Sequence, residues 1–293
     1  MGHHSQIEPQ SNSAIGSEAP DAIAAINAKI RTGSVMNVSS QAFIIAACLI
    51  VLVSMGIRQS LGLFVQPIVL STGMSIALVS LAMAIGQVMW GFAQPIAGIL
   101  AERYGIRWIA FIGFLFLVVG LVLMPLSQNA TGIFLVFGVL SAIGAGFTSI
   151  SLFIGAAVQM VPPQRTGFVS GLINASSSLG QFIFAPLVQL FLTMWSWATA
   201  AAALGLVALA SMPLLYWVTG KAIHSTSTDP ACCGVAVAND KVSFRHAWSS
   251  RNYKLLHLGF FTCGFHIAFL VTHLPGAVSM CGLPSTVASS ALA

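Results

Sequence analysis

The chain has 293 residues, of which 57% are hydrophobic and only 6% charged, and its formal net charge is +5. Its mean hydropathy is +0.93. A soluble globular domain carries roughly 25% charged residues, so this composition excludes a soluble fold and predicts a protein that lies in a lipid bilayer.

The first part of the chain is unlike the rest. Residues 1–40 are polar and rich in Ser, Asn and Ala, and they lack the basic and then apolar start of a cleaved signal peptide. We therefore predict a disordered cytoplasmic tail over 1–40.

Long apolar segments follow this tail, and each is long enough to cross a bilayer. Because lipid does not tolerate unpaired backbone groups, and because the segments lack the alternation of barrel strands, we predict an all-α polytopic helix bundle. The predicted spans are about 42–68, 75–100, 107–127, 131–160, 166–193, 196–219 and 253–281.

These spans divide into two groups. Residues 41–219 are expected to form an N-terminal six-helix bundle, 220–252 a cytoplasmic linker, and 253–293 the start of a C-terminal bundle. An eighth apolar segment begins near Pro284 and stops at Ala293. We therefore expect a C-terminally truncated form of a larger protein.

Arg58, in the first span, is the only charged residue in the interior of any of these segments, away from their first two residues. An arginine in a bilayer costs several kcal/mol unless it faces a polar cavity or a partner. Its guanidinium stays charged and matches a carboxylate, yet no Asp or Glu occurs in any span. This favours an anionic substrate as its partner. The alternative is that backbone carbonyls, or a carboxylate in helices absent from this sequence, pair with Arg58.

The loop between the second and third spans reads GILAERYGIRW. It resembles the signature G-x-L-a-D-R-x-G-R-R of the major facilitator superfamily, at the same place between the second and third helices. Glu102 replaces the usual aspartate, and Ile106 stands where a basic residue is common. The arginines would latch the cytoplasmic side by pairing with carboxylates or helix C-terminal carbonyls, and Gly98 would let a neighbouring helix approach closely. The resemblance implies a cytoplasmic gate at Gly98, Glu102, Arg103, Gly105 and Arg107.

Four further stretches resemble bacterial members of the monocarboxylate and oxalate/formate exchanger branch of that superfamily. They read GIRQSLGLFVQPI, WGFAQPIAG, RTGFVSGLINASSSLGQFIFAPL and GFHIAFLVTHLP. The resemblance implies twelve helices in two six-helix halves, each half built from two inverted three-helix repeats. It also implies that substrate binds between the halves, near the middle of the membrane.

Polar residues inside the spans are candidates for the lining of such a cavity. The two histidines of the seventh span are seven residues apart on one helix face, so they would relay a proton, bind the anion, or only pack helices through hydrogen bonds. Each Gln would bind substrate or bond to a neighbouring helix. Small residues of the fourth span, namely Gly138, Gly144 and Gly146, are expected to allow close helix packing. The predicted substrate-binding residues are Arg58, Gln59, Gln87, Gln94, Asn174, His266 and His273, with Gln66 and Gln181 as further lining candidates.

The distribution of basic residues predicts the orientation. Ten of the eleven Lys and Arg lie before the first span or in the linkers after the second, fourth and sixth spans, and the other three linkers contain none. The positive-inside rule assigns the N-terminus and these linkers to the cytoplasm. The net charge thus sets topology in a bacterial inner membrane, and no nucleic-acid partner is expected.

The linker 220–252 allows two interpretations. Phe244 and Trp248 are one helical turn apart with Arg245 nearby, which fits a short amphipathic helix on the membrane surface. A solvated linker fits equally well.

The sequence shows no nucleophile and base arrangement, no metal-ligand cluster and no phosphate-binding glycine loop, so we expect no enzyme, no metal and no cofactor. The predicted function is secondary active transport by alternating access of a small organic anion such as a monocarboxylate, by proton symport or anion exchange. The expected partners are the lipid bilayer, the anion and, in symport, protons. Alternatives are efflux of a neutral or amphipathic compound and, from another class, a non-transporting truncated remnant or a membrane sensor.

Overall fold

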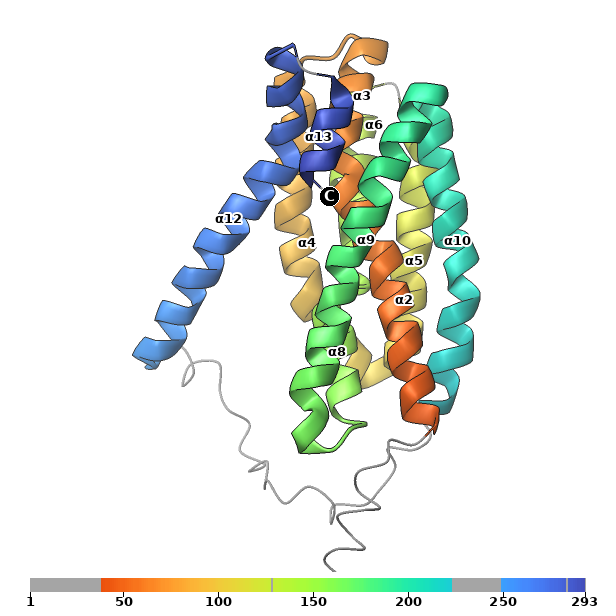
Figure 1. The fold of residues 1–293 in the computed structure, drawn as a ribbon, viewed down its shortest axis with the longest axis vertical. Helices are drawn as coiled ribbons and strands as arrows, with labels where there is room; N and C mark the ends of the chain where they lie inside the picture. Colours follow the sequence, from red (N-terminus) through yellow and green to blue (C-terminus); the bar gives the residue numbers. More distant parts are fainter. Residues whose placement is uncertain (1–37, 128, 223–248, 283, 293) are drawn as a thin grey trace, which may run out of the picture.

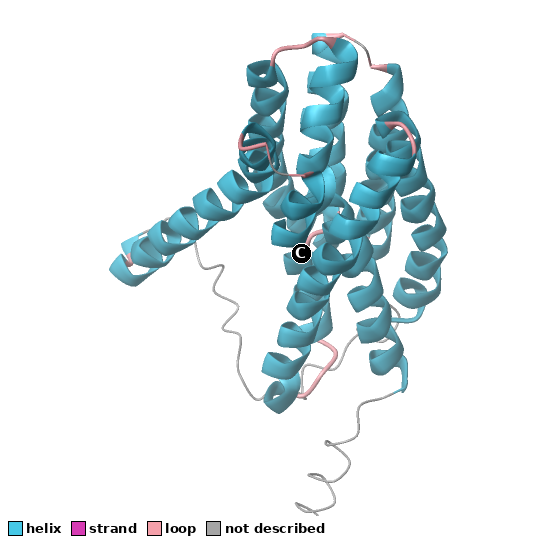
Figure 2. Ribbon diagram, turned by 45° about the horizontal axis from the view of Figure 1, so that its top comes forward, coloured by secondary structure: helices cyan, strands magenta, loops and turns pink. Residues whose placement is uncertain are grey.

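The computed structural model describes residues 38–127, 129–222, 249–282 and 284–292. The predicted tail up to residue 37 lies outside the described residues, as does the predicted amphipathic segment with Phe244 and Trp248. The described part of the chain is made of helices joined by short loops and holds no strand (Figure 2). The predicted all-α bundle is therefore confirmed.

Seven helical segments of the described chain are long and apolar enough to cross a membrane, in agreement with the seven predicted spans. The first and fourth are interrupted, whereas the others are essentially continuous. In chain order the elements are α2 (Val38–Ser60), η1 (Leu61–Phe64) and α3 (Val65–Thr72) in span 1; α4 (Ile76–Tyr104) in span 2; α5 (Ile106–Leu123) and η2 (Met124–Leu126) in span 3; α6 (Ala130–Ile133), η3 (Phe134–Leu140), α7 (Ser141–Phe147) and α8 (Ile150–Val158) in span 4; η4 (Pro163–Arg165) and α9 (Thr166–Met194) in span 5; α10 (Trp197–Ala222) in span 6; and α12 (Arg251–Met280) in span 7, followed by α13 (Ser285–Leu292).

Short turns with defined backbone chemistry join the first spans. Gly73 ends α3 with a φ of 70°, in the left-handed region that favours glycine. The Ser75 hydroxyl then caps α4 by accepting a hydrogen bond from the Leu78 amide at 3.3 Å. Gly105, with a φ of 87°, makes the turn between α4 and α5. These turns are short enough to keep successive spans antiparallel.

The pairing of spans 1 to 6 follows an internal symmetry. The main partners are α2 with α9, α4 with η3 and α7, α5 with α7, α2 with α10, and α5 with α10. Exchanging spans 1, 2 and 3 with spans 4, 5 and 6 turns the pair 1–5 into 2–4 and the pair 3–4 into 1–6, and it leaves the pair 3–6 unchanged. This pattern is the one expected for two three-helix repeats.

Glycines of span 4 bring backbones into direct contact, as the sequence predicted. A methyl group at Gly138 would lie 2.7 Å from the Ala82 carbonyl oxygen of α4, and one at Gly144 would lie 2.7 Å from the Gly113 carbonyl oxygen of α5. At Gly146 it would lie 2.5 Å from the Ala93 side chain of α4. The close packing of span 4 against spans 2 and 3 is therefore confirmed.

The seventh span stands partly apart from the bundle. Its C-terminal part packs against η1, α3 and α4, and its N-terminal part leans away from the other helices (Figure 1). Large apolar side chains on that part, including Phe260, Phe261 and Phe265, are exposed. In the packed C-terminal part of α12, the Val271 carbonyl oxygen lies where a side chain at residue 62 would be, so the contact requires Gly62. Span 7 thus packs directly against the backbone of span 1.

Candidate functional site

Arg58 lies in the last turn of α2, immediately before the η1 turn. A cation is favoured there because the C-terminal carbonyls of a helix carry partial negative charge. The guanidinium carbon lies 4.0 Å from the centroid of the Trp90 ring, so the cation stacks on the indole face. Its Nη2 donates a hydrogen bond to the side-chain oxygen of Gln87. Gln87 and Trp90 are three residues apart on α4, so one face of span 2 holds the arginine.

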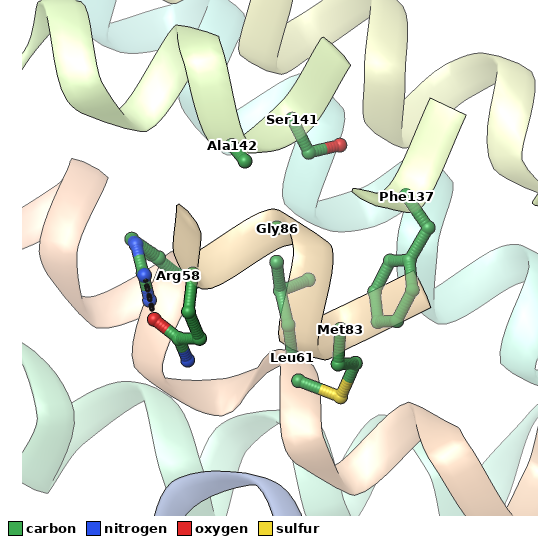
Figure 3. Close-up of a pocket in the computed structure, with 8 residues that line it drawn as sticks. Arg58, Leu61, Met83, Gly86, Phe137, Ser141 and Ala142 are labelled. Carbon is green, nitrogen blue, oxygen red and sulfur yellow. Dashed lines mark hydrogen bonds between the residues drawn. The ribbon is translucent and has the colours of Figure 1, made fainter. Parts of the chain in front are cut away.

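A small pocket opens beside this arginine (Figure 3). Its empty space, including the open mouth, is about 330 Å³. Spans 1, 2 and 4 supply the walls. The lining residues are Arg58, Leu61, Met83, Gly86, Gln87, Phe137, Ser141 and Ala142.

The wall from span 4 is built by a π-helix. The η3 segment Phe134–Leu140 is π-helical, and both the backbone amide and the hydroxyl of Ser141 donate to the Val136 carbonyl, the hydroxyl at 3.0 Å. The wider π turn re-aims the side chains that follow it, and such segments are frequent at functional sites. Here Phe137 and Ser141 both reach the pocket.

The site has more hydrogen-bond donors than acceptors. The Nε of Arg58 and the Nε1 of Trp90 are buried, and neither has a hydrogen-bond partner among the described residues. Glu102 is the only acidic residue in the described part of the chain, and it lies fifteen residues beyond Gln87 on the same helix, about 22 Å away. A buried unpaired polar group costs about 1 to 3 kcal/mol. The arrangement therefore suits an oxygen-rich anion.

The remaining polar candidates of spans 1, 2 and 5 lie elsewhere. Gln59 donates to the Ser177 hydroxyl of α9 at 3.4 Å, and the side-chain oxygen of Gln94 accepts from Ser151 of α8 at 3.2 Å. Both therefore bridge neighbouring helices in this conformation. Asn174 is exposed on α9. Half-buried Gln66 and Gln181 also lie outside the pocket lining.

The two histidines of span 7 do not join the pocket either. His266 and His273 are both exposed on α12. The His273 ring packs against Phe269 with 5.4 Å between ring centroids. Of the seven predicted substrate-binding residues, the structure brings together Arg58 and Gln87.

The predicted gate residues surround the turn between α4 and α5. Glu102 and Arg103 are exposed, and the guanidinium carbons of Arg103 and Arg107 lie 5.5 and 6.0 Å from the ring centroids of the tyrosine and tryptophan that follow them. The expectation of a close helix approach at Gly98 is wrong for the described residues, because none of their atoms lies within 4 Å of a methyl group placed there. This face of α4 is open in the described structure.

Sequence reasoning missed Trp90 and six of the eight lining residues, among them Phe137 and Ser141. Aromatic and hydroxyl residues are common in apolar spans, and the π-helix has no sequence signal of its own. One available signal was the spacing of Trp90 three residues after Gln87, which puts both on one helix face.

Comparisons with curated proteins find distant relatives. The chain is 23% identical over 226 residues to an uncharacterized MFS-type transporter, YcxA, of Bacillus subtilis (strain 168), covering 74% of this chain and 52% of that protein. It is 24% identical over 160 residues to human monocarboxylate transporter 7, covering 53% of this chain and 29% of that protein. It is 24% identical over 150 residues to the oxalate:formate antiporter of Oxalobacter formigenes, covering 50% and 34%. The chain thus spans about half the length of these relatives or less.

The family comparison covers most of the chain. The sequence model of the Major Facilitator Superfamily matches residues 47–293, which include all seven membrane-spanning segments apart from the start of the first. The match agrees with the two three-helix repeats seen in the packing of spans 1 to 6. The chain therefore belongs to the major facilitator superfamily, whose members are membrane transporters.

Proposed function

We propose that this chain belongs to a secondary active transporter of a small organic anion, and that Arg58 anchors the anion. The observation that supports the proposal is a buried guanidinium with an unpaired Nε beside a pocket, with no carboxylate near it in the described structure. A carboxylate would neutralise this charge and fill the empty hydrogen-bond position. Monocarboxylates are the proposed class because the names of two relatives refer to monocarboxylate and to oxalate and formate.

Alternating access is the proposed mechanism, driven by proton symport or by exchange of anions. Span 1 is interrupted at η1, directly after Arg58, and span 4 is interrupted by the η3 segment and again at Thr148 and Ser149. Interrupted helices in corresponding places of two repeats mark binding sites in secondary transporters. The turn around Glu102 and Arg103 is the proposed cytoplasmic gate.

Uptake of labelled lactate by cells that make the full-length protein tests the anchor. Arg58→Gln should reduce uptake roughly 10- to 100-fold, because a hydrogen bond to a charged group contributes about 1.5 to 3 kcal/mol. Arg58→Lys keeps the charge but loses the fork, so it should raise the apparent KM while uptake persists. Arg165→Gln is the matched control, since this exposed arginine lies in the loop before α9.

The same variants separate an anchor from a packing residue. If Arg58 only packs helices, the Gln and Lys variants should both lose protein in the membrane in parallel with their activity. Lactate uptake at the unchanged rate by a well-inserted Arg58→Gln protein contradicts the proposal.

A further inference from the structure

The guanidinium of Arg58 is half-occupied along one edge. Nε and Nη2 lie on the same edge of this planar group, which a carboxylate can bind through two parallel hydrogen bonds. In the structure Nη2 donates to Gln87, while Nε is buried and has no partner among the described residues. One nitrogen of the fork is therefore engaged by the protein, and the other has no partner among the described residues.

Gln87 cannot complete this edge. Its amide offers a single acceptor oxygen and no charge, whereas a carboxylate offers two oxygens and a negative charge. The guanidinium is held from its flat side by Trp90, at 4.0 Å, so its edge keeps a fixed direction. Arg58 and Gln87 both line the pocket, and the Nη2 that a bidentate anion would need is engaged by the amide of Gln87.

We propose that Gln87 is a displaceable internal cap of the anion site: its amide oxygen holds Nη2 of Arg58 while the site is empty, and the carboxylate of the substrate replaces it. The proposal rests on the proposed function, in which an anion binds Arg58. A cap competes with the substrate. The apparent affinity for the substrate is therefore the intrinsic affinity multiplied by the fraction of time in which the cap is open. A direct ligand would instead strengthen binding through its amide N–H donors.

The two roles predict opposite effects of removing the side chain. If Gln87 is a cap, Gln87→Ala should bind lactate about threefold more tightly, because the competitor is gone. Gln87→Glu should bind lactate at least about tenfold more weakly, because its carboxylate takes both edge positions and neutralises the arginine. Gln87→Glu should also raise the thermal unfolding temperature in the absence of lactate.

Binding is measured on the purified full chain in detergent, as the shift of the unfolding temperature during a lactate titration at constant ionic strength, balanced with chloride. Lactamide, a neutral analogue of similar shape, should give no shift. Gln159→Glu is the matched control, because it adds the same charge at an exposed position at the end of α8. It should bind lactate as the unchanged protein does. Formate and oxalate are titrated in the same way.

The outcomes separate the cap from the anchor. Weaker lactate binding by a folded Gln87→Ala protein, or unchanged binding by Gln87→Glu, contradicts the cap while Arg58→Gln still weakens binding. Lactate, formate and oxalate binding that is as tight in Arg58→Gln as in the unchanged protein, or that is absent from the unchanged protein, contradicts the proposed function as well. If Gln87→Glu does not fold, the sign of the change in Gln87→Ala decides alone.

Discussion

At the scale of single residues, two contacts offset most of the cost of a charge in the membrane. An arginine at the centre of a spanning helix costs about 2.5 to 3.5 kcal/mol on insertion scales. A desolvated cation–π contact contributes about 2 kcal/mol, and a hydrogen bond to a charged group about 1.5 to 3 kcal/mol. Arg58 has one of each, to Trp90 and Gln87. The empty site is therefore stable enough to exist without a bound anion.

The contribution of the indole face can be separated from that of the indole N–H. Trp90→Phe keeps an aromatic face under Arg58 and removes an N–H that has no partner in the described structure, so it should change the free energy of unfolding by less than about 1 kcal/mol. Trp90→Leu loses the stacking and should destabilise the protein by about 2 kcal/mol or more. Thermal unfolding in detergent measures both.

The control for this pair is Trp108→Leu, at an exposed tryptophan on α5, which should leave stability nearly unchanged. Equal losses in Trp90→Phe and Trp90→Leu would contradict stacking as the main contribution. That result would assign the role of Trp90 to its N–H.

At the scale of elements, the backbone contact between spans 1 and 5 replaces the hydrophobic driving force that helices lack in lipid. A methyl group at Gly180 of α9 would collide with the Leu52 carbonyl oxygen of α2. From the other side, a methyl group at Gly56 would lie 2.8 Å from the Gly180 carbonyl oxygen. The two helices are thus in contact through backbone, just below the turn of α2 that holds Arg58.

Gly180→Ala should therefore destabilise the protein by about 1 to 3 kcal/mol, the usual cost of overpacking. Gly171→Ala, on the same helix, is the matched control, since no described atom lies within 4 Å of a methyl group there. Because alanine forms helices better than glycine, that control should be neutral or stabilising by up to about 1 kcal/mol. Equal unfolding temperatures of the two variants would contradict the close contact.

The spans could be predicted from sequence, whereas their interruptions could not. Long apolar segments reveal spanning helices by length alone. By contrast, the π-helix Phe134–Leu140 lies in a stretch as apolar as its surroundings. The break at Thr148 and Ser149 is polar, but three consecutive serines lie within the continuous helix α9, so polar residues alone do not predict a break. The break is held by a tertiary contact, in which the buried Ser54 hydroxyl of α2 donates to the Thr148 carbonyl at 3.3 Å. Such contacts depend on which spans pack together, so a local sequence pattern does not show them.

The candidate site could likewise be predicted only in part, because some of its contacts depend on which helices pack together. Arg58 could be identified because it is the only charge far from the ends of the predicted spans, and its bond to Gln87 joins two residues that the sequence had both selected. Gln59 and Gln94 instead form hydrogen bonds with Ser177 and Ser151 on other helices. The spacing of residues along one helix does not reveal partners on another.

At the scale of the whole molecule, charge is segregated to one end of the bundle. Successive spans alternate in direction, so the start of α2, the turn between α4 and α5, and the end of α8 lie at the same end, as does the start of α12 (Figure 1). Arg103, Arg107, Arg165, Arg251 and Lys254 lie in or next to these segments. At the opposite end, the turns at residues 73–75 and 195–196 contain no Lys or Arg. We predict that the basic end faces the cytoplasm.

Native cysteines at the two ends test this orientation without introducing new residues. Cys281 is exposed in the turn after α12, at the end without basic residues, and Cys232 belongs to the predicted linker, outside the described residues. Variants that keep one of these cysteines and carry Ala at the others are treated, in intact cells, with a membrane-impermeant maleimide. Cys281 should be labelled at once. Cys232 should be labelled only after the cells are opened, because the positive-inside rule keeps its linker in the cytoplasm. Labelling of Cys232 in intact cells, with Cys281 protected, would reverse the orientation and place the turn around Glu102 and Arg103 outside the cell, which would remove its proposed role as the cytoplasmic gate.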